Sequence, residues 1–382
     1  MGDVEKLSPG ELSDFLDMFQ NLSANGTAYE DCCPVGQVCD LTDSQEFEAT
    51  FIVVLYSLTF VVGVLGNVLL LGVLVQSRRT WSVTDTFILH LALTDVLLLV
   101  TLPMWAAQAA QADGWTFGTP LCKITGSVFM INFYCGIFLL GCISLDRYLS
   151  IVHATQMYSR RKPWVVHTSC LVAWLFSLLL SVSDMIFLEA VEDNRQNTTK
   201  CVRNYLSGYW SDDSTGNGPK QQSRWWLASR LTYHLVGFLL PSAVMVFCYS
   251  GILRRLRCGS QGHQKQRATW VIVTVVAVFF LCWTPYNITL MVDTLQSSRS
   301  NTECGMKMSL GKAMTVTSTV GYLHCSLNPI LYAFVGVKFR RQLLALLSAL
   351  GCRVKTSRFQ STVSSRRSSI WSESAETSTV AV

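Results

Sequence analysis

Seven long apolar stretches, distributed along most of the chain, leave this sequence very few possible folds. A helix that crosses a bilayer needs about 20 predominantly apolar residues, and every stretch is long enough. Hydrophobic residues make up 50% of the chain and charged residues 14%, which is unlike a water-soluble domain of this length. The stretches are 51–75, 86–110, 121–145, 165–188, 226–253, 268–295 and 314–335. We therefore expect an all-α membrane protein, with a bundle of seven transmembrane helices over residues 51–337.

The third stretch ends abruptly in two opposite charges, Asp146 and Arg147, followed by Tyr148. Lys123, near the other end, is the only other full charge in this stretch. One interpretation is that Arg147 extends to the lipid headgroups and Asp146 only neutralises it. The other is that the pair is functional, because ionisable groups in membrane helices usually mark functional sites.

The distribution of basic residues predicts the orientation of the chain. Of the 30 Lys and Arg, 19 fall on the side of the C-terminal tail, whereas the N-terminal side holds 20 of the 25 acids. Cytoplasmic loops are enriched in Lys and Arg, so we expect a plasma membrane protein with its N-terminus outside and its C-terminus in the cytoplasm. Residues 1–50 hold 11 acids and one base, Lys6. This acidic arm is expected to be disordered and to attract a basic partner.

The predicted outer segments carry signals for covalent modification. The glycosylation sites expected from Asn-x-Ser/Thr sequences are Asn21, Asn25 and Asn197. Tyr29 stands beside two acids and is a candidate for sulfation, with a plain surface tyrosine as the alternative. A disulfide between Cys122 and Cys201 would hold the second outer loop over the third helix. Any of Cys32, Cys33 and Cys39 could reach Cys304.

Asp95 places an acid in the middle of the second apolar stretch. A carboxylate at that depth is costly, so we expect it to face the bundle interior and to meet polar side chains there. The candidate partners are Asn67, Asn132, His324 and Asn328. Together these residues could hold a small cation such as sodium, and a hydrogen-bonded network without an ion is the alternative. No other metal or cofactor is expected.

Prolines inside three of the stretches should bend their helices around an interior cavity, because each removes a backbone hydrogen bond. They are Pro103, Pro241 and Pro285. Trp283 lies just before Pro285, and in the seventh stretch Asn328 precedes Pro329, with Tyr332 close behind. We interpret these last two prolines as flexible points of a switch rather than as kinks in a static bundle.

After the seventh stretch, residues 338–350 alternate basic and apolar side chains at helical spacing. This pattern is typical of an amphipathic helix that lies on the cytoplasmic leaflet in contact with lipid. Cys352 follows it and could carry an acyl chain. Residues 351–382 have no apolar periodicity, and from Thr356 onward they contain 13 Ser and Thr. We expect a disordered tail that is open to kinases.

These motifs together resemble the signature set of rhodopsin-like G-protein-coupled receptors. The set is Asn67, Asp95, Asp146-Arg147-Tyr148, Cys282-Trp283-Thr284-Pro285 and Asn328-Pro329-Ile330-Leu331-Tyr332. Further features are similar to the chemokine receptors in particular: residues 149–154, Thr101-Leu102-Pro103, and a spare cysteine pair at Cys39 and Cys304. Three more stretches are similar to the CXC group of these receptors: 131–134, 332–339 and 364–373.

The resemblance implies a receptor for basic CXC chemokines, which the acidic arm captures before the ligand N-terminus inserts among the helices. The ligand-binding residues that it implies are Trp105, Phe129, Tyr134, Asp184, Tyr286, Asp293, Ser318 and Tyr322. Asp184 and Asp293 would pair with cationic groups of the ligand, and a solvated helix end is the alternative for both. Two departures weaken this assignment: Ser318 stands where many such receptors have glutamate, and no proline precedes Asp184.

On the cytoplasmic side, the resemblance implies that helix six swings outward and that Arg147 meets an inhibitory (Gi-type) G protein. Receptor kinases would then phosphorylate the tail, which would recruit arrestin. The switch residues implied are Asp146, Arg147, Tyr148, Trp283, Pro285, Asn328, Pro329 and Tyr332. The inner end of helix six offers Lys265 and Arg267 but no acid, so Asp146 is the expected partner of Arg147 in the inactive state.

Other classes of function lack the residues that they need. The 6 histidines show no paired metal spacing, and neither a nucleophile elbow nor a phosphate loop occurs, so an enzyme is not expected. A retinal protein would need a lysine in the middle of the seventh stretch, and a transporter would show internal repeats. A nucleic-acid partner is not expected either. The serious alternative is a scavenging receptor that binds and internalises chemokine without coupling to a G protein.

Overall fold

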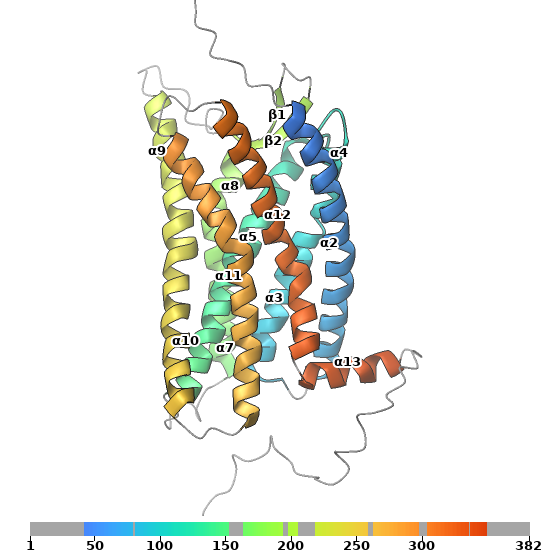
Figure 1. The fold of residues 1–382 in the computed structure, drawn as a ribbon, viewed down its shortest axis with the longest axis vertical. Helices are drawn as coiled ribbons and strands as arrows, with labels where there is room; N and C mark the ends of the chain where they lie inside the picture. The colour runs from blue at the N-terminus through green and yellow to red at the C-terminus, as the bar shows by residue number, and fades with distance from the viewer. Residues whose placement is uncertain are drawn as a thin grey trace, which may run out of the picture.

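The computed structural model describes residues 42–78, 81–152, 163–193, 198–204, 218–258, 263–297, 304–335 and 337–349. In this part of the chain, long helices run side by side in one bundle (Figure 1). A hairpin of β1 (Leu188–Asp193) and β2 (Thr198–Arg203) covers one end, and α13 (Val337–Ala349) lies across the other. We call these the hairpin end and the α13 end. Some predicted sites lie outside the described residues: Asn21, Asn25, Tyr29, Cys39, Asn197, Cys352 and the side chain of Cys304.

Each of the seven predicted stretches is mostly helical. All seven helices begin before the predicted limits, but the second and seventh end at them, and the fourth ends one residue early because Leu188 begins β1. The first, third, sixth and seventh are α2 (Thr42–Gln76), α5 (Gly118–Ile151), α11 (His263–Ser297) and α12 (Cys304–Val335). The second is α3 (Val83–Leu99) with α4 (Leu102–Ala110), and the fourth is α7 (Pro163–Leu180) with α8 (Val182–Phe187). The fifth joins α9 (Gly218–Thr232), η2 (Tyr233–Leu239) and α10 (Leu240–Cys258). The predicted seven-helix membrane bundle is confirmed.

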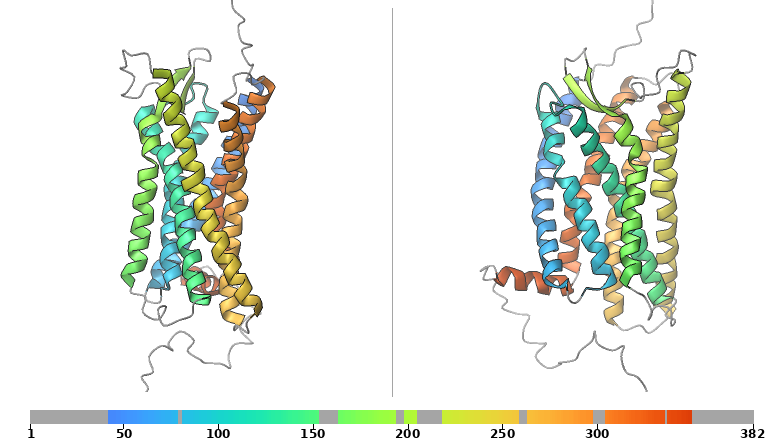
Figure 2. Two further views of the ribbon diagram at one scale, coloured as in Figure 1. Left: turned by 90° about the vertical axis from the view of Figure 1, so that its left-hand side faces the viewer. Right: turned by 180° about the vertical axis from the view of Figure 1, so that it is seen from behind.

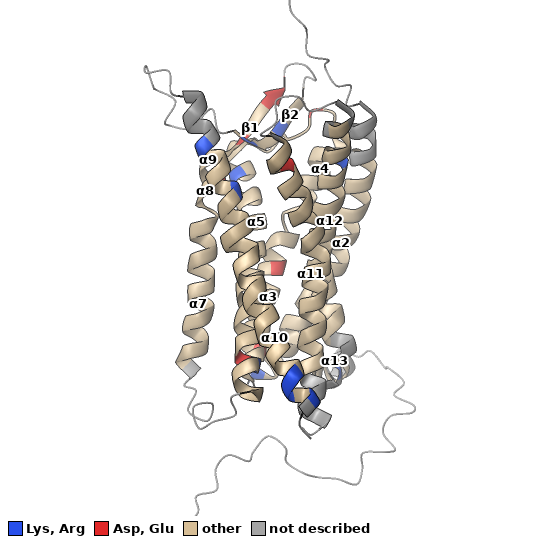
Figure 3. Ribbon diagram, turned by 60° about the vertical axis from the view of Figure 1, so that its left-hand side comes forward, with Lys and Arg blue, Asp and Glu red and all other residues tan. Residues whose placement is uncertain are grey.

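Within the described residues, 6 of these helical segments are long and apolar enough to cross a membrane by themselves. The remaining one, α12, has sufficient length but carries many polar side chains along its middle. Those that are buried in the bundle are Thr319, His324, Ser326 and Asn328. The polar groups of α12 therefore face protein rather than lipid, as every polar group at membrane depth must. Figure 3 shows the complementary pattern, since charged residues lie mostly toward the two ends of the bundle, apart from an acid in its middle.

Two interruptions in the helices accompany prolines. α3 ends at Leu99 and α4 begins at Leu102, so Pro103 lies in the first turn of α4, where a missing N–H leaves no helical bond unmade. Before Pro241, the chain forms the seven-residue π-helix η2, and the N–H of Leu240 bonds to the oxygen of Leu235. The sequence indicated a bend in the fifth helix but did not reveal this wider turn.

The fourth helix is interrupted without a proline. α7 ends at Leu180, and the hydroxyl of Ser181 donates a hydrogen bond of 2.8 Å to the oxygen of Ser177. A serine that bonds back to its own helix often bends it. Asp184 lies in α8, the short helix that follows this break.

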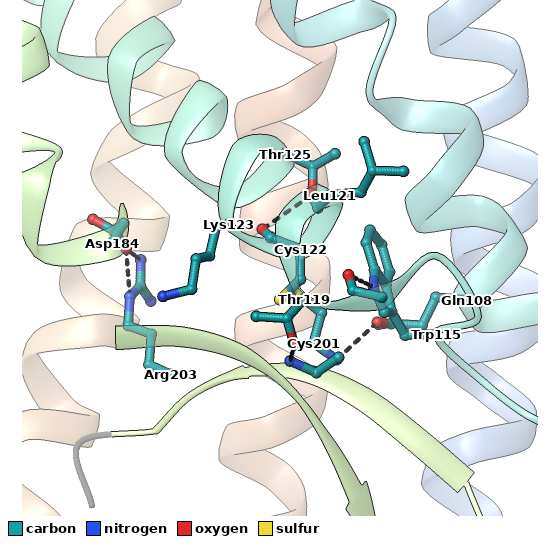
Figure 4. The surroundings of a disulfide bond; sticks show 12 residues. Gln108, Trp115, Thr119, Leu121, Cys122, Lys123, Thr125, Asp184, Cys201 and Arg203 are labelled. Carbon is teal, nitrogen blue, oxygen red and sulfur yellow. Dashed lines mark hydrogen bonds and ion pairs between the residues drawn. A yellow bond between two sulfur atoms is a disulfide. The ribbon is translucent and has the colours of Figure 1, made fainter. Parts of the chain in front are cut away.

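The hairpin is held to the bundle at several points. The predicted disulfide between Cys122 and Cys201 is confirmed, and it ties β2 to the start of α5 (Figure 4). The backbone of the segment before α5 pairs with the hairpin as well, since the N–H of Trp115 donates to Thr199 O at 2.7 Å. Seen from behind, the two strands extend over the ends of the neighbouring helices (Figure 2). The hairpin therefore forms a fixed cover over part of this end of the bundle.

Candidate functional site

A cavity of about 350 Å³ lies between the helices at the hairpin end. Four of the predicted ligand-binding residues line it, and all four are aromatic: Trp105, Phe129, Tyr286 and Tyr322. The other four, which are Tyr134, Asp184, Asp293 and Ser318, are not among the lining residues. The structure therefore brings four of the five predicted aromatic residues together and leaves Tyr134 and the predicted acids outside the cavity wall.

Both acids are instead paired with arginines of the chain. Arg203 at the end of β2 reaches Asp184, with 2.5 Å from Nη2 to Oδ1 and 2.6 Å from Nε to Oδ1. Arg230 on α9 reaches Asp293 on α11, with 2.9 Å between Nη2 and Oδ2. Asp184 is buried and Asp293 is half-buried, so neither is a fully solvated helix end.

The sequence analysis did not assign Arg203 and Arg230 to the site, although both line the cavity. Two signals could have found them. Arg203 follows Cys201 closely, so the disulfide that fixes Cys201 over α5 also fixes Arg203 nearby. Arg230 is a basic residue inside the fifth apolar stretch, where charge is expensive and usually has a function.

Below the cavity, an aromatic cluster leads toward the middle of the bundle. The Trp283 ring, which is fully buried, lies 5.6 Å from the ring of Phe129 and 6.2 Å from that of Tyr286, measured between centroids. Phe279 lies 6.2 Å from Trp283 on one side and 5.2 Å from His324 on the other. Phe129 and Tyr286 of the cavity wall thus contact the ring of Trp283. Phe279 lies between Trp283 and His324, which belongs to the polar middle of the bundle.

That polar middle is centred on Asp95, which is buried and accepts two hydrogen bonds. Asn132 donates at 3.1 Å and Asn328 at 2.8 Å, each from Nδ2. Asn67 lies on the same interface, where its Nδ2 donates to the backbone oxygen of Cys325 at 2.9 Å. Ligand atoms of Asp95, His324 and Cys325 lie within 4.8 Å of one another. All five predicted members of the polar network therefore meet between α2, α3, α5 and α12.

Several buried atoms of this network lack a hydrogen-bond partner among the residues that the structure describes. They are Asn67 Oδ1, Asn328 Oδ1 and both ring nitrogens of His324. Buried polar atoms are costly without a partner, and carboxylate and amide oxygens are ligands for hard cations. With the carboxylate of Asp95, this set of donors fits a small cation.

At the α13 end, Asp146 and Arg147 lie close to each other and to α3. Arg147 Nε is 3.7 Å from Asp146 Oδ2, and Arg147 Nη2 donates a hydrogen bond to the hydroxyl of Thr84. The Arg147 side chain is 21% exposed, whereas that of Asp146 is 3% exposed. Tyr148 packs against Phe247 of α10, with ring centroids 5.4 Å apart. Arg147 is thus held between neighbouring helices and remains accessible from the α13 end.

The remaining predicted switch residues lie inside long helices. Pro285 is within α11 and Pro329 within α12, and neither ends its helix. Tyr332 is buried near the last turn of α12. Each proline removes one backbone hydrogen bond, so each marks a point at which its helix bends more easily.

Comparison with known proteins identifies the family to which this chain is similar. A model of the family described as 7 transmembrane receptor (rhodopsin family) matches residues 66–332. The chain is 44% identical over 373 residues to C-X-C chemokine receptor type 3 of Bos taurus, covering 96% of each chain. It is 43% identical over 379 residues to that of Homo sapiens, covering 99% of this chain and 98% of the relative. C-X-C chemokine receptor type 5 of Homo sapiens is 38% identical over 365 residues, or 94% of each chain. The resemblance inferred from the motifs is confirmed.

Proposed function

Because the chain belongs to the rhodopsin family of seven-transmembrane receptors, and within it to the chemokine receptors, we propose that it binds CXC chemokines and activates an inhibitory heterotrimeric G protein. In this proposal the hairpin end faces the outside of the cell and the α13 end faces the cytoplasm. The excess of Lys and Arg in the segments on the α13 side supports that orientation. The acidic residues 1–50 would then meet a basic chemokine first, by an attraction that weakens with salt.

The observation that carries this proposal is the route between the two ends of the bundle. Phe129 and Tyr286 belong to the cavity wall and also contact Trp283 on α11, the helix that contains Pro285. A ligand group that enters the cavity would therefore act on α11 directly. Arg147 is held by Asp146 and Thr84 at the opposite end. An outward movement of α11 would open a crevice there for the G protein, so that ligand and G protein bias one equilibrium between two states.

The polar middle of the bundle fits a regulatory role within the same scheme. Asp95, Asn67, Asn132, His324 and Asn328 would hold a sodium ion, which supplies the positive charge that a buried carboxylate requires. These side chains come from four helices, so a cation among them would favour the arrangement in which the helices are closest. We propose that sodium thereby favours the inactive state and opposes agonist binding.

Phosphorylation of the Ser- and Thr-rich tail by receptor kinases would then recruit arrestin, because it adds negative charge. The alternative is a scavenging receptor with the same ligand cavity and no G-protein response. Asp146, Arg147 and Tyr148, packed as described, favour signalling over scavenging.

The experiment that tests the proposal measures chemokine-stimulated nucleotide exchange on an inhibitory G protein in membranes that contain this chain. A panel of CXC and CC chemokines is applied to the wild type, to Arg147→Ala and to Leu145→Ala. Leu145 is a matched control because it lies on the same helix and faces away from the core. We expect Arg147→Ala to bind chemokine normally and to lose exchange, and Leu145→Ala to keep both. Chemokine binding without exchange in the wild type would establish the scavenger instead.

A further inference from the structure

We propose that the cavity at the hairpin end binds a carboxylate carried on an apolar or aromatic body, and that Arg203 and Arg230 recognise it. Both arginines line the cavity, whereas the two acids that pair with them do not. The inference deepens the proposed function, because it assigns the chemistry of the ligand group that enters this site. It also revises the expectation that Asp184 and Asp293 attract cationic ligand groups.

The first pair places its positive member toward the cavity. The side chain of Asp184 is 3% exposed and that of Arg203 is 37% exposed. The carboxylate thus lies behind the guanidinium and already has an arginine as its counter-ion. A cationic ligand group could approach Asp184 only past Arg203, which would repel it. An anionic group meets the planar guanidinium first, and that group binds carboxylates with well-defined geometry.

The second pair offers its arginine in the same way. Arg230 Cζ lies 5.6 Å from the centroid of the Trp226 ring, which also lines the cavity. Contact with the ring face favours the cation at this position. Asp293 contacts Arg230 from α11, outside the lining. A carboxylate in the cavity would therefore share Arg230 with Asp293.

A third basic residue adds to the positive field. Lys123 Nζ donates hydrogen bonds of 3.0 Å to the backbone oxygens of Met185 and Ile186, which carry no net charge. Figure 4 shows Lys123 beside the pair of Asp184 and Arg203. Lys123 thus adds a positive group beside the pair of Asp184 and Arg203, and neither Asp184 nor Asp293 is among the residues that line the cavity. Coulomb attraction to these basic groups favours an anion there.

The rest of the wall is apolar and aromatic. Phe129 and Tyr322 lie 5.0 Å apart between ring centroids, and Tyr286 and Trp105 complete an aromatic lining. The cavity volume of about 350 Å³ is within the range of small-ligand sites. A free inorganic anion would leave this surface uncovered, whereas an aromatic acid would cover it and reach the arginines.

The test compares two probes that share an indole ring and differ in charge, indole-3-acetate and tryptamine. Their dissociation constants for the purified full-length receptor are measured by saturation-transfer difference NMR. We expect indole-3-acetate to bind at least tenfold more tightly than tryptamine, and its advantage to shrink as salt increases. The swapped variant Arg230→Asp/Asp293→Arg keeps an ion pair and replaces one of the two arginines of the cavity wall by an acid, so it should lose the preference for indole-3-acetate.

The matched control is a second swap, Lys200→Asp/Asp193→Lys. This pair, 3.6 Å apart in the hairpin, does not line the cavity, so its reversal should leave the preference between probes unchanged. Equal binding of the two probes, or a preference that survives the Arg230 swap, would overturn the proposal. Should that swap fail to fold, Arg230→Gln tests the same point, with at least a tenfold loss of indole-3-acetate binding expected. Neither probe requires chemokine or G protein, so a failure here is distinguishable from a failure of the proposed function.

Discussion

Asn67 on α2 donates a hydrogen bond of 2.9 Å from Nδ2 to the backbone oxygen of Cys325 on α12. Cys325 lies four residues before Pro329, so its oxygen is the acceptor that a proline leaves without an N–H. The Asn67 side chain replaces the missing donor. α12 can therefore contain a proline in the middle of the membrane without an unsatisfied carbonyl, which would be costly there.

Asn67→Ala should destabilise the receptor, because the oxygen of Cys325 would lose this partner inside the bundle. The expected loss is about 1–3 kcal/mol in the free energy of unfolding, measured from thermal unfolding in detergent. Thr59→Val is the control on the same helix, since the Thr59 hydroxyl bonds only to Leu55 O within α2, an oxygen that the helix already supplies with a donor. Equal stability of Asn67→Ala and the wild type would show that the bond contributes nothing.

Gly66→Ala should disturb the same interface by crowding. A Cβ at this position would lie 2.6 Å from Cγ of Pro329, which is too close for carbon atoms. We expect a loss of about 1–3 kcal/mol of stability from overpacking. Gly141→Ala is the control, because nothing lies within 4 Å of its Cβ position, and it should be neutral or slightly stabilising. If both variants unfolded at the same temperature, α2 and α12 would not lie as close together at Gly66 as the structure shows.

Arg203→Gln should be more harmful than the double change Arg203→Gln/Asp184→Asn. The single change leaves the carboxylate of Asp184, which is 3% exposed, without its arginine. Removing one partner of a fully buried pair costs about 3–5 kcal/mol. Because Arg203 is 37% exposed, we expect a smaller loss of about 1–3 kcal/mol, and the double change removes the stranded charge. Thermal unfolding of the two single variants and the double variant completes the cycle. Additive effects would mean that the two residues are not coupled.

Asp95→Asn should abolish the effect of sodium on agonist affinity. In the wild type, replacing choline chloride by sodium chloride should weaken chemokine binding, because in the proposed function sodium favours the inactive arrangement. A coupling of 1–3 kcal/mol corresponds to roughly a fivefold change or more. Potassium chloride at the same ionic strength controls for screening. A sodium effect of the same size in Asp95→Asn and in the wild type would show that sodium does not act at Asp95.

The sequence was sufficient for the fold because hydropathy and length determine which segments span a membrane. It was also sufficient for the polar middle, since an acid such as Asp95 at that depth must meet polar side chains. The fifth helix shows the limit. Pro241 predicts a bend but not the π-helix η2, within which a Cβ at Gly237 would collide with the ring of Tyr134. Such a contact between two helices is not visible in a local pattern.

The ligand cavity could be predicted only in part. The family resemblance implied Trp105, Phe129, Tyr286 and Tyr322 as ligand-binding residues, and all four line the cavity. The charges could not be assigned in this way, because Asp293 meets Arg230 across 63 positions in the sequence. Whether an acid faces a ligand or an arginine depends on which side chains the fold brings together. The family resemblance assigned Asp184 and Asp293 to the ligand, whereas in the structure each forms an ion pair with an arginine of the chain.

The polarity of α12 sets the order in which the bundle can assemble. The side chain of Asn328 and the backbone oxygen of Cys325 would be unsatisfied polar groups if α12 entered the lipid alone, and each would cost several kcal/mol. Asp95 and Asn67, on helices synthesised much earlier, supply the partners that make this segment acceptable to the membrane. The last spanning helix, α12, is therefore held in the membrane by its contacts with α2 and α3. Insertion of the receptor is complete only when its first and last spanning helices have packed together.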